Sequence, residues 1–258
     1  MKIISWNVNG IRAVERRGDL DRFLQKYAPD VLLLQETKVK ADQLSEYLKD
    51  HPEYHQFYNS AEQPGYAGTA IWLKKKLDKI PVFLTDMPDF LDREGRITRV
   101  DFDDIAILSI YFPNGGKSES AWQEKLVFYD AFLNYVNALR AQGKKVIWGG
   151  DVNCAHEEID LARPQENEHH IGFLPEERAW LDKVIAADWV DIFRSKYPEK
   201  VMYSWWHVIS RARERNVGWR IDYFFVDTKL FSKVRKIEYL NEQMGSDHCP
   251  VSLEIESS

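Results

Sequence analysis

The residues of this sequence that could do chemistry are oxygen and nitrogen ligands at the ends of short apolar runs. They are Asn7, Asn9, Glu36, Tyr111, Asn114, Asp151, Asn153, Asp222, Asp247 and His248. A single asparagine or aspartate after a strand usually only forms a turn. Because the ends of neighbouring strands meet at one edge of a sheet, their repetition at so many ends predicts a single site.

The first group of these side chains predicts hydrolysis assisted by a divalent cation. Glu36, Asn7 and Asp247 carry the hard oxygen atoms that Mg²⁺ or Mn²⁺ prefers. Asp151 could take a proton from water. Asn153 lies two residues further on, so on an extended segment both side chains point to the same side. The amide could then orient the nucleophile or the phosphate.

The second group would stabilise negative charge on a phosphate. Asp222 could orient the imidazole of His248 and favour its protonated form beside a phosphate oxygen. Tyr111 adds a phenolic donor. A cation, an imidazolium and a phenol would each stabilise the transition state of phosphodiester hydrolysis.

Other chemistries fit the sequence less well. It contains no glycine-rich nucleotide-binding fingerprint. The spacings of Cys154, His156, His248 and Cys249 do not match common zinc sites. A cysteine nucleophile at either cysteine stays open, although small buried thiols are the commoner case.

Composition is typical of a cytoplasmic protein. The 258 residues carry a formal net charge of −6, which argues mildly against a nucleic-acid partner. Basic residues nevertheless gather at 211–220 and 228–237, where a solvated face is the alternative interpretation. The longest aliphatic run, 31–34, is too short to span a bilayer, so we expect no membrane partner. Two cysteines without a framework pattern indicate reduced thiols.

The elements that must position these residues follow from apolar patterns. Strands are expected at 3–8, 31–35, 69–73, 97–102, 105–112, 145–149, 221–226 and 251–255. Helices are expected over 19–27 and 121–140 and from Pro175 onward, the second with a capping box of Ser120 and Gln123. Alternating strands and helices without a linker or repeat predict one α/β domain over residues 1–258. Composition leaves the arrangement of the sheets open.

Together these motifs resemble the exonuclease III family of abasic-site endonucleases, within the endonuclease/exonuclease/phosphatase superfamily. The matching segments are 4–13, 34–38, 94–96, 111–114, 150–156, 218–224 and 245–250. The Asp-x-Asn and Ser-Asp-His motifs occur across the superfamily. The stretch 218–224 and the residues around Glu36 are more specific to the nuclease branch.

The resemblance implies a four-layer α/β sandwich, with two packed mixed β-sheets flanked by helices. It implies a nuclease dependent on Mg²⁺ or Mn²⁺ that cuts double-stranded DNA 5′ to abasic sites and leaves a 3′-hydroxyl. Activity as a 3′-phosphodiesterase on blocked 3′ ends and as a 3′→5′ exonuclease is also implied, and we expect a monomer.

The resemblance also implies roles for individual residues. Glu36 resembles the main metal ligand, with Asn7 and Asp247 nearby, and Asp151 and Asn153 are expected to serve both the metal and the water. Asp222, His248 and Tyr111 complete the expected catalytic set. The residues expected to contact DNA are Asn9, Arg12, Arg96, Asn114, Lys117, Asn167, His170, Trp205, Trp219 and Ile221.

Three positions depart from the pattern of some relatives. Asn9 stands where some animal relatives carry aspartate, and His170 where certain relatives carry asparagine. Trp205 stands where some carry phenylalanine in the abasic pocket. These departures leave exonuclease strength and lesion preference open.

The aromatic residues beside Asp222 predict a pocket for a sugar without a base. Trp219, Trp205 and Ile221 would form its apolar wall, which a normal nucleotide could not enter without losing its stacking. The alternative is that these side chains only fill the core. A phosphatase or phosphodiesterase acting on inositol or lipid phosphates would use the same ionisable groups. A catalytically silent DNA-binding protein would usually lack one of them.

Overall fold

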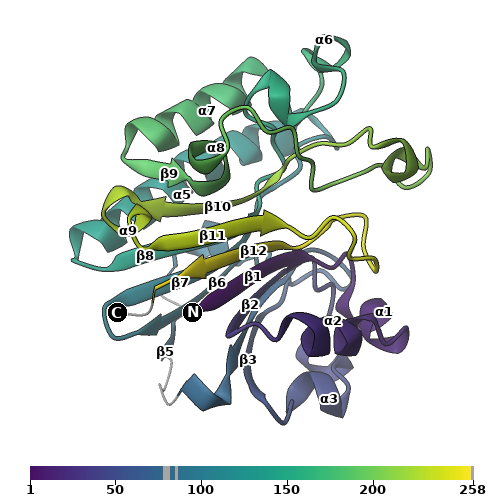
Figure 1. Ribbon diagram of the computed structural model, residues 1–258, viewed down its shortest axis with the longest axis vertical. Helices are drawn as coiled ribbons and strands as arrows, with labels where there is room; N and C mark the ends of the chain where they lie inside the picture. The colour runs from purple at the N-terminus through teal and green to yellow at the C-terminus, as the bar shows by residue number, and fades with distance from the viewer. Residues whose placement is uncertain (78–81, 85–86, 257–258) are drawn as a thin grey trace.

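Two six-stranded β-sheets define the architecture of the computed structural model, which describes residues 1–77, 82–84 and 87–256 (Figure 1). The strands are β1 (Lys2–Asn7), β2 (Val31–Gln35), β3 (Tyr54–Asn59), β4 (Thr69–Lys74), β5 (Val82–Leu84), β6 (Ile97–Phe102), β7 (Ile105–Tyr111), β8 (Lys145–Asp151), β9 (Trp189–Asp191), β10 (Asp222–Asp227), β11 (Val234–Tyr239) and β12 (Val251–Ile255). The helices are α1 (Ile11–Arg16), α2 (Asp19–Tyr27), α3 (Glu46–Lys49), α4 (Asp89–Asp92), α5 (Glu119–Ala141), α6 (Pro164–Asn167), α7 (Pro175–Ala186), α8 (Ile192–Lys196) and α9 (Thr228–Phe231). Short 3₁₀ turns lie at Ala41–Gln43, Lys75–Leu77, Glu158–Asp160 and Ala212–Arg215.

Both sheets are mixed and follow the same pattern. The first has the order β11-β12-β1-β2-β4-β3 and the second the order β5-β6-β7-β8-β10-β9. In each, the two central strands are parallel, β1 with β2 and β7 with β8, and all other pairs are antiparallel. The parallel pairs require long crossovers, which α1, α2 and α5 supply.

The sheets pack face to face between two helical layers. Side chains such as Ile3, Leu33, Ile107 and Phe224 form the core between the sheets. A second core joins the outer face of the first sheet to α1, α2 and α3, and a third joins the outer face of the second sheet to α5 and α7. Figure 1 shows these helices on opposite sides of the stacked sheets. This is the expected four-layer α/β sandwich.

The expected helices form with small differences in their bounds. The long helix α5 begins two residues earlier than the pattern predicts, because Ser118 and not Ser120 is its N-cap. The Ser118 hydroxyl accepts from the backbone N–H of Ala121 at 3.1 Å, whereas Ser120 bonds Glu124. The predicted capping box of Ser120 and Gln123 is therefore wrong. Helix α7 does begin with Pro175 in its first turn.

Four strands that the apolar pattern does not predict are the four edge strands of the two sheets. They are β3, β5, β9 and β11. One face of β11 is charged and exposed, β3 is largely half-exposed, and β5 and β9 are three residues long. Within the described residues, no helix is long and apolar enough to cross a membrane.

Candidate functional site

The predicted site residues gather at one edge of the stacked sheets. Asn7 ends β1, Tyr111 ends β7 and Asp151 ends β8, and in the second sheet Tyr111 and Asp222 both lie opposite Asp151. Here they line a cavity of about 370 Å³. Its lining is Glu36, Tyr66, Tyr111, Asn114, Lys117, Asp151, Asn153, Ile171, Gly172, Trp205, Trp219, Ile221, Asp247 and His248. The cavity is therefore lined both by ionisable groups and by an aromatic wall of Trp205 and Trp219.

Two carboxylates and an amide form the floor of the site. The Asn7 Nδ2 donates to Glu36 Oε1 and to Asp151 Oδ2, each at 2.9 Å. Asn7 is fully buried. Glu36 adopts a positive φ of 47° just after β2, which is rare for a residue with a side chain. This local strain at a polar position is typical of functional sites.

Asp222 holds His248 as the sequence predicts. The Nδ1 of His248 lies 2.8 Å from Asp222 Oδ2, and its Nε2 lies 3.8 Å from Asp151 Oδ2. Burial by itself lowers the pKa of His248, but the negative charges of Asp222 and Asp151 outweigh it and raise this pKa to about 10. The imidazole is therefore protonated at neutral pH and presents a positive charge to the cavity.

The pKa of the Asp151 carboxyl group is raised well above the usual value of an aspartate. Complete burial raises it most, His248 lowers it, and the negative charges of Asp222 and Glu36 raise it, which together bring this pKa to about 7. Such a carboxyl group exchanges a proton near neutral pH. A pKa close to the working pH is the property that a general base requires.

Asn153 reaches the site by a turn rather than along a strand. Strand β8 extends to Asp151, beyond the predicted end at Gly149. The chain then turns, with Asn153 at φ 52° and its backbone N–H donating to Asp151 Oδ1 at 2.8 Å. The prediction of an extended segment with both side chains on one side is therefore wrong. The Asn153 amide instead donates to Phe112 O and accepts from Asn114.

A chain of polar contacts joins Glu36 to Asp247. Lys38 Nζ lies 2.8 Å from Glu36 Oε2 and donates to Asn9 Oδ1. Asn9 in turn donates to Asp247 Oδ1 at 3.0 Å, and Trp205 Nε1 donates to Asp247 Oδ2 at 3.1 Å. Both oxygens of Asp247 thus have protein donors, and its carboxylate lies outside the cluster around Glu36.

Arg96 supports Tyr111 from behind. The arginine is buried, with 3% exposure, and its guanidinium carbon lies 5.0 Å from the centre of the Tyr111 ring. It also pairs with Glu94 and donates to Tyr66 Oη at 3.0 Å. Burial raises the pKa of the Tyr111 phenol well above its usual value, so this group stays a proton donor. Arg96 therefore fixes Tyr111 and Tyr66, which does not fit its expected direct contact with DNA.

Trp205 and Trp219 form the aromatic end of the cavity. Their backbones exchange hydrogen bonds of 2.9 Å, and their rings lie edge to face with centres 6.5 Å apart. Ile221 is buried beside them. Both tryptophans keep half-exposed surface, so they do not simply fill the core. Gly172 faces Trp219 closely, because a Cβ at Gly172 would lie 3.1 Å from that ring.

Asn167 and His170 lie outside the lining of this cavity, in the segment just before Ile171, which does line it. The Asn167 amide is used by the backbone of Arg163 within α6, and His170 is exposed. Of the expected DNA contacts, these two are therefore not brought to the site by the fold.

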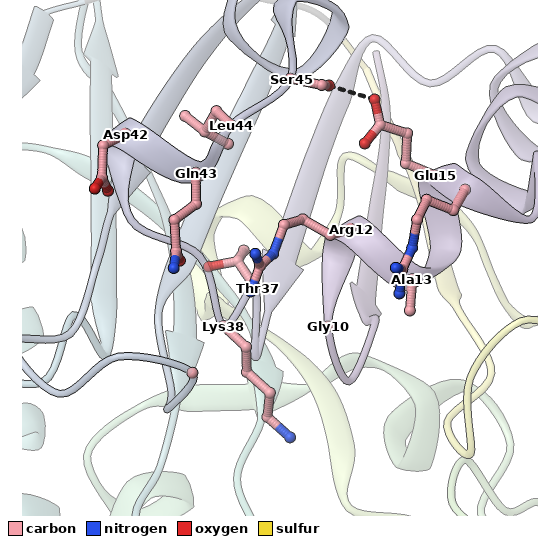
Figure 2. A pocket seen from close by; sticks show the side chains of 12 residues that line it. Gly10, Arg12, Ala13, Glu15, Thr37, Lys38, Asp42, Gln43, Leu44 and Ser45 are labelled. Atoms are coloured by element: carbon pink, nitrogen blue, oxygen red, sulfur yellow. Dashed lines mark hydrogen bonds between the residues drawn. The ribbon is translucent and has the colours of Figure 1, made fainter.

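Arg12 lines a second cavity that adjoins the first. This cavity, of about 650 Å³, lies between α1 and the loop after β2 and also contains Thr37 and Lys38. Figure 2 shows the Arg12 side chain extending toward Thr37. Lys38 lines this cavity, and its Nζ pairs with Glu36, which lines the first cavity.

Arg220 and Arg213 are structural, which the sequence analysis did not anticipate. Arg220 is fully buried and pairs with Asp160 at 2.7 Å and with Asp191 at 2.8 Å. Arg213 donates to the backbone oxygens of Ser246, Asn241 and Gln243, so it holds the loop that carries Asp247. The fully buried Arg220 is therefore not available to a phosphate.

The basic run at 228–237 lies at a sheet edge, outside the cavity lining. Arg235 pairs with Glu256, and Lys236 pairs with Glu238 at 2.7 Å. Here the solvated face is the interpretation that the structure supports. Both cysteines are buried, and burial raises the pKa of Cys154 well above its usual value, which disfavours a thiolate nucleophile.

The floor of the site fits a hard divalent cation. Glu36, Asp151 and His248 offer ligand atoms that all lie within 4.8 Å of one another. Two carboxylates bridged by one amide repel each other, and a cation would relieve that repulsion. His248 has its Nδ1 on Asp222 and is protonated, so the carboxylates are the better ligands. A second cluster, His156 with Glu157 and Asp182, lies on the surface and is held by Arg178.

Comparison of the sequence with known proteins gives close matches over the whole chain. The model of the endonuclease/exonuclease/phosphatase family matches residues 4–248. An exodeoxyribonuclease of Bacillus subtilis is 39% identical over 256 residues, covering 99% of each chain. The DNA repair nuclease APEX1 of Danio rerio is 36% identical over 256 residues, covering 98% of this chain and 81% of its own.

Solved structures share the fold. The AP endonuclease of Leishmania major superposes with a TM-score of 0.90 at 29% identity, covering 100% of this chain and 88% of that protein. The APE2 catalytic domain of Xenopus laevis superposes with a TM-score of 0.87 at 28% identity, covering 99% of this chain and 91% of that one.

Proposed function

The chain belongs to the endonuclease/exonuclease/phosphatase family, and from that premise we propose that it is a DNA repair nuclease which cuts the phosphodiester 5′ to abasic sites. Its relatives include exodeoxyribonucleases and a DNA repair nuclease. The observation that supports the proposal is that one cavity is lined by a general base (Asp151), an imidazolium (His248) and an aromatic wall. We propose that one domain, acting as a monomer, contains the complete site.

The cleavage step follows from the ionisation of the site. Asp151 takes a proton from a water molecule, whose oxygen attacks the phosphorus. The bond from phosphorus to the 3′-oxygen breaks, and the departing oxygen takes up a proton from the solvent, which leaves a 3′-hydroxyl on one side and a 5′-phosphate on the abasic sugar. His248 donates to a phosphate oxygen, and the Tyr111 phenol stabilises the charge that develops there.

Three further residues orient the reacting groups in this proposal: Asn7 and Asn153 contact Asp151, and Asp222 contacts His248. Asn153 holds the turn that directs Asp151, and Asp222 keeps the imidazole in its protonated state. A Mg²⁺ or Mn²⁺ ion held by Glu36 and Asp151 would stabilise charge on the phosphate and lower the pKa of water. Asp247 would act at the margin of that ion, through Asn9 and Lys38.

The aromatic wall supplies the preference for a lesion. A sugar without a base leaves the helix without losing stacking, whereas an intact nucleotide pays an unstacking cost of a few kcal/mol. The backbone of Gly172 lies so close to the Trp219 ring that a Cβ at Gly172 would be only 3.1 Å from it, so little room remains between them. A base would collide with this wall, while deoxyribose alone would not.

Cations around the cavity suit the DNA backbone despite the net charge of −6. Lys117 lies in the cavity lining with its Nζ 4.3 Å from the centre of the Tyr66 ring. Arg12 and Lys38 extend the positive surface into the adjoining cavity. Phosphate contacts of this kind give affinity that falls steeply with salt.

The test is a substrate panel with pure protein. Duplexes carrying an abasic site, a deoxyuridine, a 3′-phosphate or no lesion are incubated with and without chelator, beside inositol phosphates. We expect incision 5′ to the abasic site, release of the 3′-phosphate, and loss of both in chelator. Faster hydrolysis of inositol phosphates than of abasic duplex would overturn the proposal, as would binding of abasic DNA without any incision.

A further inference from the structure

A buried ion pair lies directly beneath the cavity without lining it. Lys125 of α5 and Glu177 of α7 are both fully buried, and their charged groups are in contact. Taking two charges out of water costs several kcal/mol for each ion. A pair of apolar side chains of similar volume would often stabilise a fold as well or better. Stability of the helical layer therefore does not account for this pair.

Lys125 binds the two loops that carry the polar end of the cavity. Its Nζ donates to Asn114 O at 3.1 Å and to Asn153 O at 2.9 Å. Asn114 follows β7 and Asn153 follows β8, so one ammonium group sets the spacing of both turns. The stem of Lys125 also packs under Gly115, where a Cβ would lie 3.0 Å from its Cδ.

Glu177 binds the loop that closes the aromatic end. One carboxylate oxygen pairs with Lys125, and the other accepts from the backbone N–H of Gly172 at 2.6 Å and of Leu174 at 3.0 Å. Gly172 faces the Trp219 ring. A shift of Glu177 therefore moves the backbone that limits the space beside this tryptophan.

We propose that Lys125 and Glu177 form one positioning unit that fixes the distance between the Asn153 turn and the Gly172–Trp219 wall. Two helices on the outer face of the second sheet would thereby determine which nucleotides the cavity accepts. The inference rests on the proposed function, because it assigns lesion selectivity to the same cavity. Misplacement of a reacting group by about 1 Å can reduce a rate by about a hundredfold.

Substitution of either partner tests the unit. In Lys125→Met and Glu177→Gln, we expect kcat on abasic duplex to fall by about ten- to a hundredfold, with KM for the duplex little changed. The ratio of abasic to undamaged cleavage should fall in both variants. Lys125→Arg keeps the charge and two donors, so it should recover part of the ratio.

Arg99→Met is the matched control. Arg99 is also buried, with 3% exposure, and pairs with Asp101 at 2.7 Å, but it lies on β6 outside the cavity lining. We expect Arg99→Met to lower the melting temperature as much as Lys125→Met does, and to leave kcat and the lesion ratio unchanged. Equal kinetic losses in the control would show a general effect of destabilisation and overturn the inference.

A double variant keeps the test decisive if Lys125→Met does not fold. Lys125→Met combined with Glu177→Leu replaces the pair by apolar groups and should recover stability. The lesion ratio should still fall, because the four backbone hydrogen bonds are lost. A folded double variant with the wild-type ratio and kcat would refute the positioning unit. Failure of the wild type itself to prefer abasic duplex would instead refute the proposed function.

Discussion

At the scale of single residues, the site works through the mutual dependence of its charges. Asp151 and His248 are both buried, and each changes the pKa of the other: the imidazolium opposes the rise in the pKa of Asp151, and Asp151 helps to keep His248 protonated. A carboxyl group with a pKa of about 7 beside a cation with a pKa of about 10 is a combination of base and charge stabiliser at neutral pH.

Loss of either group should abolish most turnover. We expect Asp151→Asn and His248→Asn each to reduce kcat on abasic duplex by at least about a hundredfold, the usual scale for a positioned base or charge stabiliser. Equilibrium binding of abasic duplex should largely survive, because the backbone contacts lie elsewhere. His156→Asn, a change of a histidine outside the cavity, is the control. A variant that keeps more than a tenth of the wild-type kcat would contradict the assigned role.

Asp222 and His248 should behave as one unit. Asp222→Ala removes the negative charge that raises the pKa of His248, so it should resemble a milder His248 variant. The double variant should then lose much less than the product of the two single losses. Single-turnover rates of the four proteins measure this cycle. Multiplicative losses would mean that the contact at 2.8 Å has no part in the reaction.

Glu36→Gln should impair the use of metal more than the binding of DNA. The carboxamide keeps the shape of the side chain and removes the charge that a hard cation requires. We expect a higher Mg²⁺ concentration for half-maximal activity, with duplex affinity in chelator unchanged. Glu15→Gln, in the adjoining cavity, is the control. An unchanged Mg²⁺ dependence in Glu36→Gln would be evidence against this role.

Most of the ionisable residues that line the cavity could be predicted from the sequence, as could the contact of Asp222 with His248, but the other contacts could not. Strand-end position predicts that Asp151, Asp222 and His248 share a site. The turn that brings Asn153 to Asp151 depends on a positive φ, which local composition does not specify. Arg96 shows the same limit, because a sequence motif cannot tell a buried cation that supports a tyrosine from an exposed one that binds phosphate.

At the scale of elements, the ends of strands provide the catalytic side chains, and helices α5 and α7 position the loops around the cavity. The strand ends were predictable because central strands are continuous apolar runs. The edge strands β3, β5, β9 and β11 were not, since edges are short, polar and charged to prevent pairing with other chains. Lys125 was also missed. Its spacing from Phe128 and Tyr129 places it on the apolar face of α5, but a lysine is almost never fully buried unless it is paired, and the sequence does not show that Glu177 is its partner.

The aromatic wall gives a prediction at this scale. Trp219→Ala should lower the ratio of abasic to undamaged cleavage and leave the melting temperature nearly unchanged, because the ring is half-exposed. The matched control is Trp189→Ala on β9, whose ring is buried with 1% exposure. That change should cost about 3–5 kcal/mol of stability and keep the ratio. A large fall in the melting temperature of Trp219→Ala, with an unchanged ratio of abasic to undamaged cleavage in the folded protein, would instead show that Trp219 is a core residue.

At the scale of the whole molecule, two sheets of identical strand pattern stack so that the C-terminal ends of their central parallel strands meet at the site. The sequence shows no internal repeat, because the two sheets have the same pattern of strand pairing but are built from very different side chains. Fold class was predictable from alternating strands and helices. The division into two sheets was not, because it depends on which strands pair across long separations.

Asp160 should contribute to global stability in a way that depends on pH. It lies between Arg220 and Arg194, and burial, which would raise its pKa, is outweighed by these cations, so the pKa falls from 3.8 to about 2. A depressed pKa stabilises the folded state above the unfolded value and loses that effect as pH falls from about 4 to about 2. The difference corresponds to about 2 kcal/mol.

Urea unfolding between pH 5 and pH 2 measures this contribution. Asp160→Asn should be less stable at pH 5, and its free energy of unfolding should fall by about 2 kcal/mol less than that of the wild type over this range. Asp182→Asn changes an exposed carboxyl group and should follow the wild-type curve. Parallel curves for the wild type and Asp160→Asn would exclude the expected contribution.

The antiparallel pairing of β1 with β12 has a consequence for folding during synthesis of the protein. Register joins Lys2 to Glu254, and His248 stands just before the last strand. During translation, β1 therefore lacks its antiparallel neighbour until β12 has left the ribosome. A nascent chain, or one released early by a premature stop codon before His248, would lack the imidazolium. Such a chain would also lack β12, the antiparallel neighbour of β1, so the sheet and the site are completed together by the same C-terminal segment.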